Sequence, residues 1–124
     1  MIGYVTLGTN DIEKSAAFYD ALLGEMGASR MMEDDTFVAW NTGPGQPGVS
    51  VIKPHNGEAA TVGNGVMVAI ACDSPETVDR LYNKAIELGA VDEGPAGPRG
   101  DQFYVGYFRD LDGNKLNFFC LPRS

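Results

Sequence analysis

The chain has 124 residues, which is enough to bury the hydrophobic core of one ordinary domain without disulfides or metal ions. Its formal net charge of −8 argues against nucleic acid as a partner, because binding to a phosphate backbone relies on clustered Lys and Arg. No apolar run approaches the roughly 20 residues of a membrane-spanning helix, and no signal segment opens the chain. We therefore expect a cytoplasmic protein with no membrane partner.

The first half of the chain predicts one strand, one helix and three further strands. Residues 1–8 alternate as a strand does, with Tyr4 and Thr6 on one face and Val5 and Leu7 on the other. Apolar residues at three- and four-residue spacing predict a helix over residues 12–23, capped by a side-chain oxygen of Asn10-Asp11. Short extended runs at 30–32, 36–40 and 49–52 then predict a three-strand meander.

The second half repeats this order after a polar segment at residues 55–64. Residues 66–72 predict a strand, and Ser74-Pro75-Glu76 is a strong helix start, since Ser caps and Pro fits the first helical position. The runs 103–108 and 115–121 flank a turn sequence at 110–114 and predict a hairpin. A first meander strand near 90–93 is weakly marked, and the Gly- and Pro-rich run 94–100 reads as a loop.

The two halves are copies of one unit. Laying the first over the second places Tyr4 on Met67, Glu13 on Glu76 and Tyr19 on Tyr82. We expect an α+β fold of two βαβββ modules, at about 1–54 and 65–124, joined by a linker at about 55–64. Two such units favour a pseudo-symmetric domain that encloses a ligand cavity at the junction of its modules.

Two motifs resemble the vicinal oxygen chelate superfamily, which includes glyoxalase I, bleomycin-resistance proteins and extradiol dioxygenases. Residues 10–19 (NDIEKSAAFY) open the first helix as in that family, and residues 107–117 (YFRDLDGNKLN) resemble its closing hairpin, with Leu111 in place of a proline. The resemblance covers the whole chain, 1–124. It implies one domain whose eight strands curve into an open, barrel-like mixed sheet around a cavity, with the helices outside, and it implies a homodimer.

Enzymatic members of that family usually hold a divalent metal through His and Glu side chains on four strands. Alignment of the motifs places these four positions at Tyr4, Ser50, Met67 and Asn117. None is His or Glu, and a hard divalent cation needs carboxylate or imidazole donors. We therefore predict that the cavity holds no metal and no cofactor.

Aromatic side chains and one cation supply the other candidate ligand contacts. Trp40 precedes the first Gly/Pro-rich loop, and Tyr104 follows the second together with Phe103 and Tyr107. Arg99 is the cation in the approach to the strand at 103–108, and loops of this composition often border sites. We predict that Arg99 attracts an anionic ligand.

Other reactive side chains are better explained by structure. Cys72 and Cys120 fall out of phase with the predicted cavity positions of their strands, so both predict buried, reduced thiols. Asp110 and Asp112 belong to a tight turn, where Asp side chains bond nearby backbone amides.

The leading hypothesis is metal-independent binding of a small molecule. Ser50 and Asn117 would hydrogen-bond the ligand, and Tyr4, Trp40, Met67 and Tyr104 would pack against it. The acidic surface would suit a cationic compound, whereas Arg99 would attract an anionic one. Two alternatives remain open. One is a glyoxalase-like lyase or isomerase, or a dioxygenase-related enzyme, whose metal is held by other residues such as Glu33, His55 or Glu58. The other is a regulatory module that binds a protein through its outer sheet face.

Overall fold

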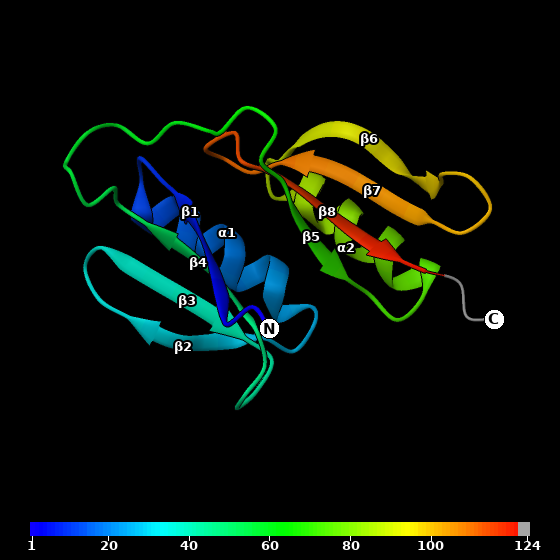
Figure 1. Ribbon diagram of the computed structural model, residues 1–124, viewed down its shortest axis with the longest axis horizontal. Helices are drawn as coiled ribbons and strands as arrows, with labels where there is room; N and C mark the ends of the chain where they lie inside the picture. Colours follow the sequence, from blue (N-terminus) through cyan, green and yellow to red (C-terminus); the bar gives the residue numbers. More distant parts are fainter. Residues whose placement is uncertain (122–124) are drawn as a thin grey trace. The chain divides into compact units, whose positions relative to one another are not determined.

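The structure of the protein is a computed structural model, in which residues 1–121 are described. The chain divides into two compact units, Met1–Val62 and Gly63–Ser124, and the boundary falls in the polar segment between the two sequence repeats. Each unit contains four strands and one helix in the order β-α-β-β-β (Figure 1). The predicted α+β fold of two βαβββ modules is therefore confirmed.

The first unit contains a mixed four-stranded sheet. Its elements in chain order are β1 (Tyr4–Gly8), α1 (Ile12–Gly24), β2 (Ser29–Glu33), β3 (Phe37–Asn41) and β4 (Gly48–Ile52). The strands lie in the order β1-β4-β3-β2. β1 is parallel to β4, whereas the two other pairs are antiparallel. A parallel pair needs a long crossover connection, and the chain between β1 and β4 supplies it.

The second unit repeats this topology. Its elements are β5 (Val68–Ala71), α2 (Pro75–Glu87), β6 (Val91–Pro98), β7 (Tyr104–Arg109) and β8 (Lys115–Cys120). The strand order is β5-β8-β7-β6, and again only the outer pair β5 and β8 is parallel. The eight strands thus form two four-stranded sheets and are not hydrogen-bonded into a closed barrel.

Side-chain caps begin both helices where the sequence predicted them. The carboxylate of Asp11 accepts from the backbone N–H of Lys14 at 3.1 Å, and the hydroxyl of Ser74 accepts from that of Thr77 at 3.2 Å. These contacts satisfy donors that a helix leaves unpaired in its first turn. Gly89 follows the second helix with a φ of +107°, a conformation that favours glycine, and so ends it.

Each helix covers one face of its own sheet (Figure 1). In the first unit Trp40 of β3 packs on Tyr19 of α1 with ring centroids 5.5 Å apart, and in the second unit Phe108 stacks on Phe118 at 5.4 Å. Ala39 is buried on the other face of β3, but the buried apolar residues that face the helices lie two positions apart along the strands, as strand geometry requires. Among them are Leu7, Val38, Val51, Leu116 and Phe118.

The prediction of a loop over residues 94–98 was wrong, because β6 runs through them to Pro98. β6 is the edge strand of its sheet and pairs only with β7. Proline and glycine are tolerated on an edge strand, where no second neighbour needs the missing N–H. Register shifts between Asp92 and Gly94 and between Gly94 and Gly97 absorb the irregular stretch.

Gly106 of β7 is required by the packing of α2 on the second sheet. A Cβ at Gly106 would lie 2.8 Å from Cδ1 of Tyr82 and 3.2 Å from the Cα of Ala96. The Tyr82 ring cannot shift easily, because it is only 8% exposed and its hydroxyl donates to Asp92 at 2.5 Å. The aromatic ring of the helix therefore crosses the strand only where the strand lacks a side chain.

Replacing Gly106→Ala should lower the free energy of unfolding by about 1–3 kcal/mol, since the added methyl forces Tyr82 or β6 to move. Urea denaturation followed by circular dichroism measures this change. Gly24→Ala is the matched control, because a Cβ there meets no atom within 4 Å and the backbone is helical. A Gly106→Ala protein as stable as the Gly24→Ala protein would contradict this account of the packing.

Candidate functional site

The face of each sheet opposite its own helix, here called the helix-free face, carries most of the residues selected from the sequence. In the first unit this face bears Tyr4, Thr6 and Ser50, because the intervening Val5 and Leu7 point toward α1. In the second unit it bears Ala69, Tyr107 and Asn117, which are neighbours across β5, β8 and β7. Strand alternation therefore groups the predicted contacts into one set for each unit.

In the first unit, the hydroxyl of Ser50 is already used within the sheet. Ser50 is fully buried, donates to the carbonyl oxygen of Val5 at 2.8 Å and lies 2.9 Å from Oγ1 of Thr6. A hydroxyl has a single hydrogen, so this side chain has no donor left for a ligand. Ser50 thus holds β4 against β1.

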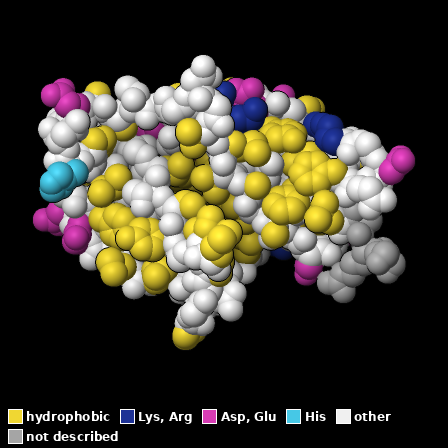
Figure 2. Space-filling model, viewed as in Figure 1, with side chains coloured by type: hydrophobic (Ala, Val, Ile, Leu, Met, Phe, Trp, Pro, Cys, Tyr) yellow, Lys and Arg dark blue, Asp and Glu magenta, His cyan; other side chains and the backbone are white. Residues whose placement is uncertain are grey.

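An apolar surface surrounds Tyr4 on the first helix-free face. The side chain of Tyr4 is 58% exposed, and its ring meets Phe37 edge-on with centroids 6.3 Å apart. Met31 and Met32 of β2, the opposite edge strand of the sheet, are also exposed, and Sδ of Met31 would touch a Cβ at Gly48. Figure 2 shows hydrophobic side chains gathered over the strands of this unit.

In the second unit, Asn117 replaces the carboxylate that the family resemblance leads one to expect. It is 1% exposed, and its Nδ2 donates to Sδ of Met67 at 3.6 Å. Its Oδ1 is buried and accepts no hydrogen bond from any described residue. A buried acceptor without a donor costs free energy, so this atom favours a partner that supplies an N–H or O–H.

Two cations lie over the ring of Tyr107 on the same face. The guanidinium carbon of Arg99 is 5.9 Å from the ring centroid, and Nζ of Lys115 is 5.3 Å from it. Tyr107 pairs directly with Asn117 across β7 and β8. Arg99 was predicted from the sequence and Lys115 was not, although Lys115 lies two residues before Asn117 and strand alternation puts both on one face.

Trp40 and Tyr104 do not join these groups. The indole of Trp40 is 1% exposed and donates to the carboxylate of Asp20 in α1 at 2.8 Å. The hydroxyl of Tyr104 donates to Asp79 of α2 at 2.6 Å. Both side chains therefore point to the helix of their own unit, since each is out of phase with the helix-free positions of its strand.

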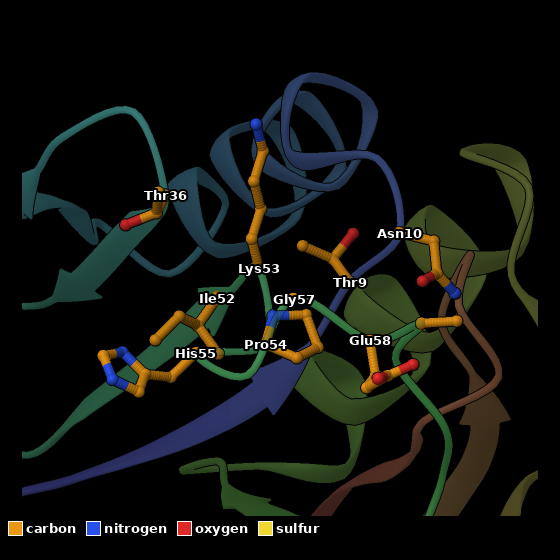
Figure 3. A pocket seen from close by; sticks show the side chains of 10 residues that line it. Thr9, Asn10, Thr36, Ile52, Lys53, Pro54, His55, Gly57 and Glu58 are labelled. Carbon is orange, nitrogen blue, oxygen red and sulfur yellow. The ribbon is translucent and has the colours of Figure 1, made fainter.

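The other metal ligands considered from the sequence are not brought together. His55 and Glu58 line a pocket of about 490 Å³ beyond the ends of β1 and β4, where the imidazole and the carboxylate point away from each other (Figure 3). Glu33 pairs instead with Arg30. Within residues 1–121, no group of three or more His, Cys, Asp or Glu side chains could hold a metal ion.

Both cysteines are free thiols, as the sequence predicted. Burial raises the pKa of Cys72 to about 11 and also raises the pKa of Cys120. Only the thiolate attacks electrophiles, so both side chains are poor nucleophiles at neutral pH. A covalent mechanism through these cysteines is therefore disfavoured.

Alkylation of the folded protein by iodoacetamide at pH 8 should be slower than that of the unfolded chain by about two orders of magnitude, because the raised pKa leaves little Cys72 thiolate. Mass spectrometry of quenched samples measures the rate at each cysteine. The same protein in concentrated urea is the control. Equal rates in the two conditions would contradict the raised pKa of Cys72, and a faster rate in the folded protein would show that it is an activated thiol.

Comparison with known proteins identifies the family. The model of the glyoxalase/bleomycin resistance protein/dioxygenase superfamily matches residues 1–118. The chain belongs to this superfamily. A glyoxalase/bleomycin resistance protein from Albidiferax ferrireducens is 36% identical, with 98% of this chain and 99% of that chain aligned and a TM-score of 0.90.

Two solved structures of lower sequence identity agree in fold. A hypothetical protein from S. aureus is 29% identical over 97% of this chain and 92% of its own, with a TM-score of 0.75. A lactoylglutathione lyase from Agrobacterium tumefaciens is 18% identical over the same shares, with a TM-score of 0.73, and shows likeness of fold alone. No curated protein matches the chain. No helix among the described residues is long and apolar enough to cross a membrane.

Proposed function

We propose that the protein binds a small organic molecule on the helix-free faces of its sheets and that it does so without a metal ion. The observation that carries this proposal is the contact between Asn117 and Met67, in which an amide N–H donates to a thioether. By the family resemblance, a carboxylate and an imidazole usually stand at these two positions. In this chain an amide and a thioether stand there instead, and they hydrogen-bond to each other rather than offering a carboxylate and an imidazole to a metal ion.

The donor chemistry at all four positions disfavours a divalent cation. Ser50 donates its only hydroxyl hydrogen to a backbone carbonyl, and Tyr4 presents a phenol. The thioether of Met67 is a soft ligand, which suits Cu(I) rather than the hard or borderline ions of this superfamily. No group in the set offsets the dehydration of a 2+ ion with a formal charge.

The same faces suit an organic ligand. Binding sites for small molecules are mostly apolar with a few placed polar groups. The first helix-free face offers Tyr4, Met31 and Met32 as exposed apolar contacts, and methionine adapts its shape to irregular partners. The second face offers the acceptor of Asn117, which would fix the orientation of a ligand bound on that face. Packing plus one or two hydrogen bonds is a means of binding rather than of catalysis.

A homodimer in the cytoplasm completes the proposal. Its support is the family resemblance for the dimer and, for the location, the lack of an apolar run of the length that crosses a membrane. Light scattering of the purified protein tests the dimer, and a mass of one chain would remove that part of the proposal without touching the ligand-binding part.

We expect less than one tenth of a metal ion per chain after purification and dialysis against Ni²⁺, Zn²⁺, Mn²⁺ or Fe²⁺ in turn. Elemental analysis measures the content. The thermal midpoint should be the same with each ion as with EDTA, because only a ligand that prefers the folded state raises it. One ion per chain together with a raised midpoint would refute metal independence and would favour a metal-dependent enzyme.

A double variant supplies the positive control for that experiment. Met67→His with Asn117→Glu puts an imidazole and a carboxylate where the side chains already approach to 3.6 Å. These are ligands that Zn²⁺ and Ni²⁺ accept. The variant should gain measurable Zn²⁺ or Ni²⁺ affinity, and the parent protein should not. Such a gain would show that the assay detects a site at these positions.

A further inference from the structure

The second helix-free face carries a local positive charge in a protein that is acidic as a whole. Nearly twice as many acidic as basic residues, 17 against 9, give the chain its net charge of −8. Yet Arg99 and Lys115 both lie over the ring of Tyr107, at 5.9 and 5.3 Å from its centroid. Figure 2 shows basic side chains beside the apolar surface of this unit. Both charges would attract an anion that binds beside this ring.

No carboxylate neutralises these two cations in the described part of the chain. Other basic residues do have acidic partners, for example Arg30 with Asp20 and Arg109 with Glu93. The guanidinium of Arg99 is held instead by backbone carbonyls, with Nη2 donating to Pro95 at 2.8 Å and Nη1 donating to Pro98 at 3.2 Å. The backbone thus positions this cation and leaves its charge unpaired.

Gly94 makes the position of Arg99 possible. A Cβ at Gly94 would lie 3.3 Å from Nη2 of Arg99 and 3.2 Å from Cδ2 of Tyr107. Its φ of +151° is also a conformation that favours glycine. Because Gly94 has no side chain, Arg99, which follows the end of β6, can fold back over the sheet.

Three side chains of different chemistry follow one another along β8 on the same face. Lys115, Asn117 and Phe119 are two residues apart, which spaces them by roughly 6.6 Å in a strand. The first is a cation, the second holds a buried carbonyl oxygen without a donor, and the third packs on Phe103 with ring centroids 5.5 Å apart. Charge, hydrogen-bond acceptor and aromatic surface follow one another in this order.

We propose that this face binds aromatic amide carboxylates, in which an aromatic ring, an amide N–H and a carboxylate follow in sequence, as in N-aroyl amino acids. The carboxylate lies against Arg99 and Lys115, the N–H donates to Oδ1 of Asn117, and the ring packs on Phe119. This inference rests on the proposed function and names its ligand class. The local charge selects an anion, in contrast to the cationic compound that the net charge alone suggests.

Hippurate is the probe, because its benzoyl ring, single amide N–H and carboxylate match the series. We expect calorimetric binding in EDTA at low ionic strength that weakens as salt is added, since screening reduces attraction between exposed charges. The neutral amide of hippurate should bind at least tenfold more weakly. O-benzoylglycolate, which has an ester oxygen in place of the N–H, should also lose about tenfold.

Variants assign each part of the ligand to its residue. Arg99→Gln and Lys115→Gln should each weaken hippurate binding about tenfold, whereas Lys14→Gln, a matched change on α1 of the other unit, should not. Asn117→Leu, which removes the unsatisfied acceptor at similar volume, should abolish the preference of hippurate over the ester. Circular dichroism and the thermal midpoint confirm that each variant is folded.

The outcomes separate this inference from the proposed function. If the neutral amide binds as tightly as hippurate, or if Lys115→Gln leaves the affinity unchanged, the ligand class is refuted. If no carboxylate binds but neutral or cationic aromatic compounds do so in EDTA, the ligand class fails and metal-independent binding stands. If no compound of any charge binds, both fail.

Discussion

The alternation of side chains along the strands is the constraint on which the candidate site depends. Each sheet gives one face to its helix, and a residue two positions along the strand shares the face of the first. Trp40 and Tyr104 therefore point toward the helices of their units, whereas Asn117 and Tyr107 lie on the helix-free face. A shift of one residue in register would exchange the two groups, so the packing of α1 and α2 decides which side chains a ligand can meet.

Much of this arrangement could be predicted from the sequence, because its signals are local. The caps at Asp11 and Ser74, the repeat and the alternation of residues 1–8 all depend on near neighbours in the chain. The strand through Pro95 and Pro98 could not be predicted in this way, because propensity disfavours it and only its place at the sheet edge permits it.

The candidate site was less predictable for the same reason. Arg99 was selected for its loop composition, but its position over Tyr107 depends on a backbone contact and on the missing side chain of Gly94. Lys115 could have been predicted from the sequence, because it lies two residues before Asn117 and alternation puts the two side chains on one face of the strand. The position of Trp40 could not be predicted, because its indole N–H donates to Asp20 on a helix twenty residues earlier, a tertiary contact that no local pattern reveals.

The loss of metal ligands and the local positive charge have a common physical basis. In a superfamily site with a bound cation, the ion supplies the positive charge that polarises or attracts an anionic group. Without a carboxylate at Met67 or Asn117, the face has no charge at these positions to balance an ion, and it also has none there to repel an anion. Arg99 and Lys115 can then attract a carboxylate directly, and a neutral amide at position 117 accepts an N–H where a carboxylate would repel the ligand. Losing the carboxylate at position 117 therefore has two effects at once: it removes a ligand for a cation, and it lets the face accept an anion.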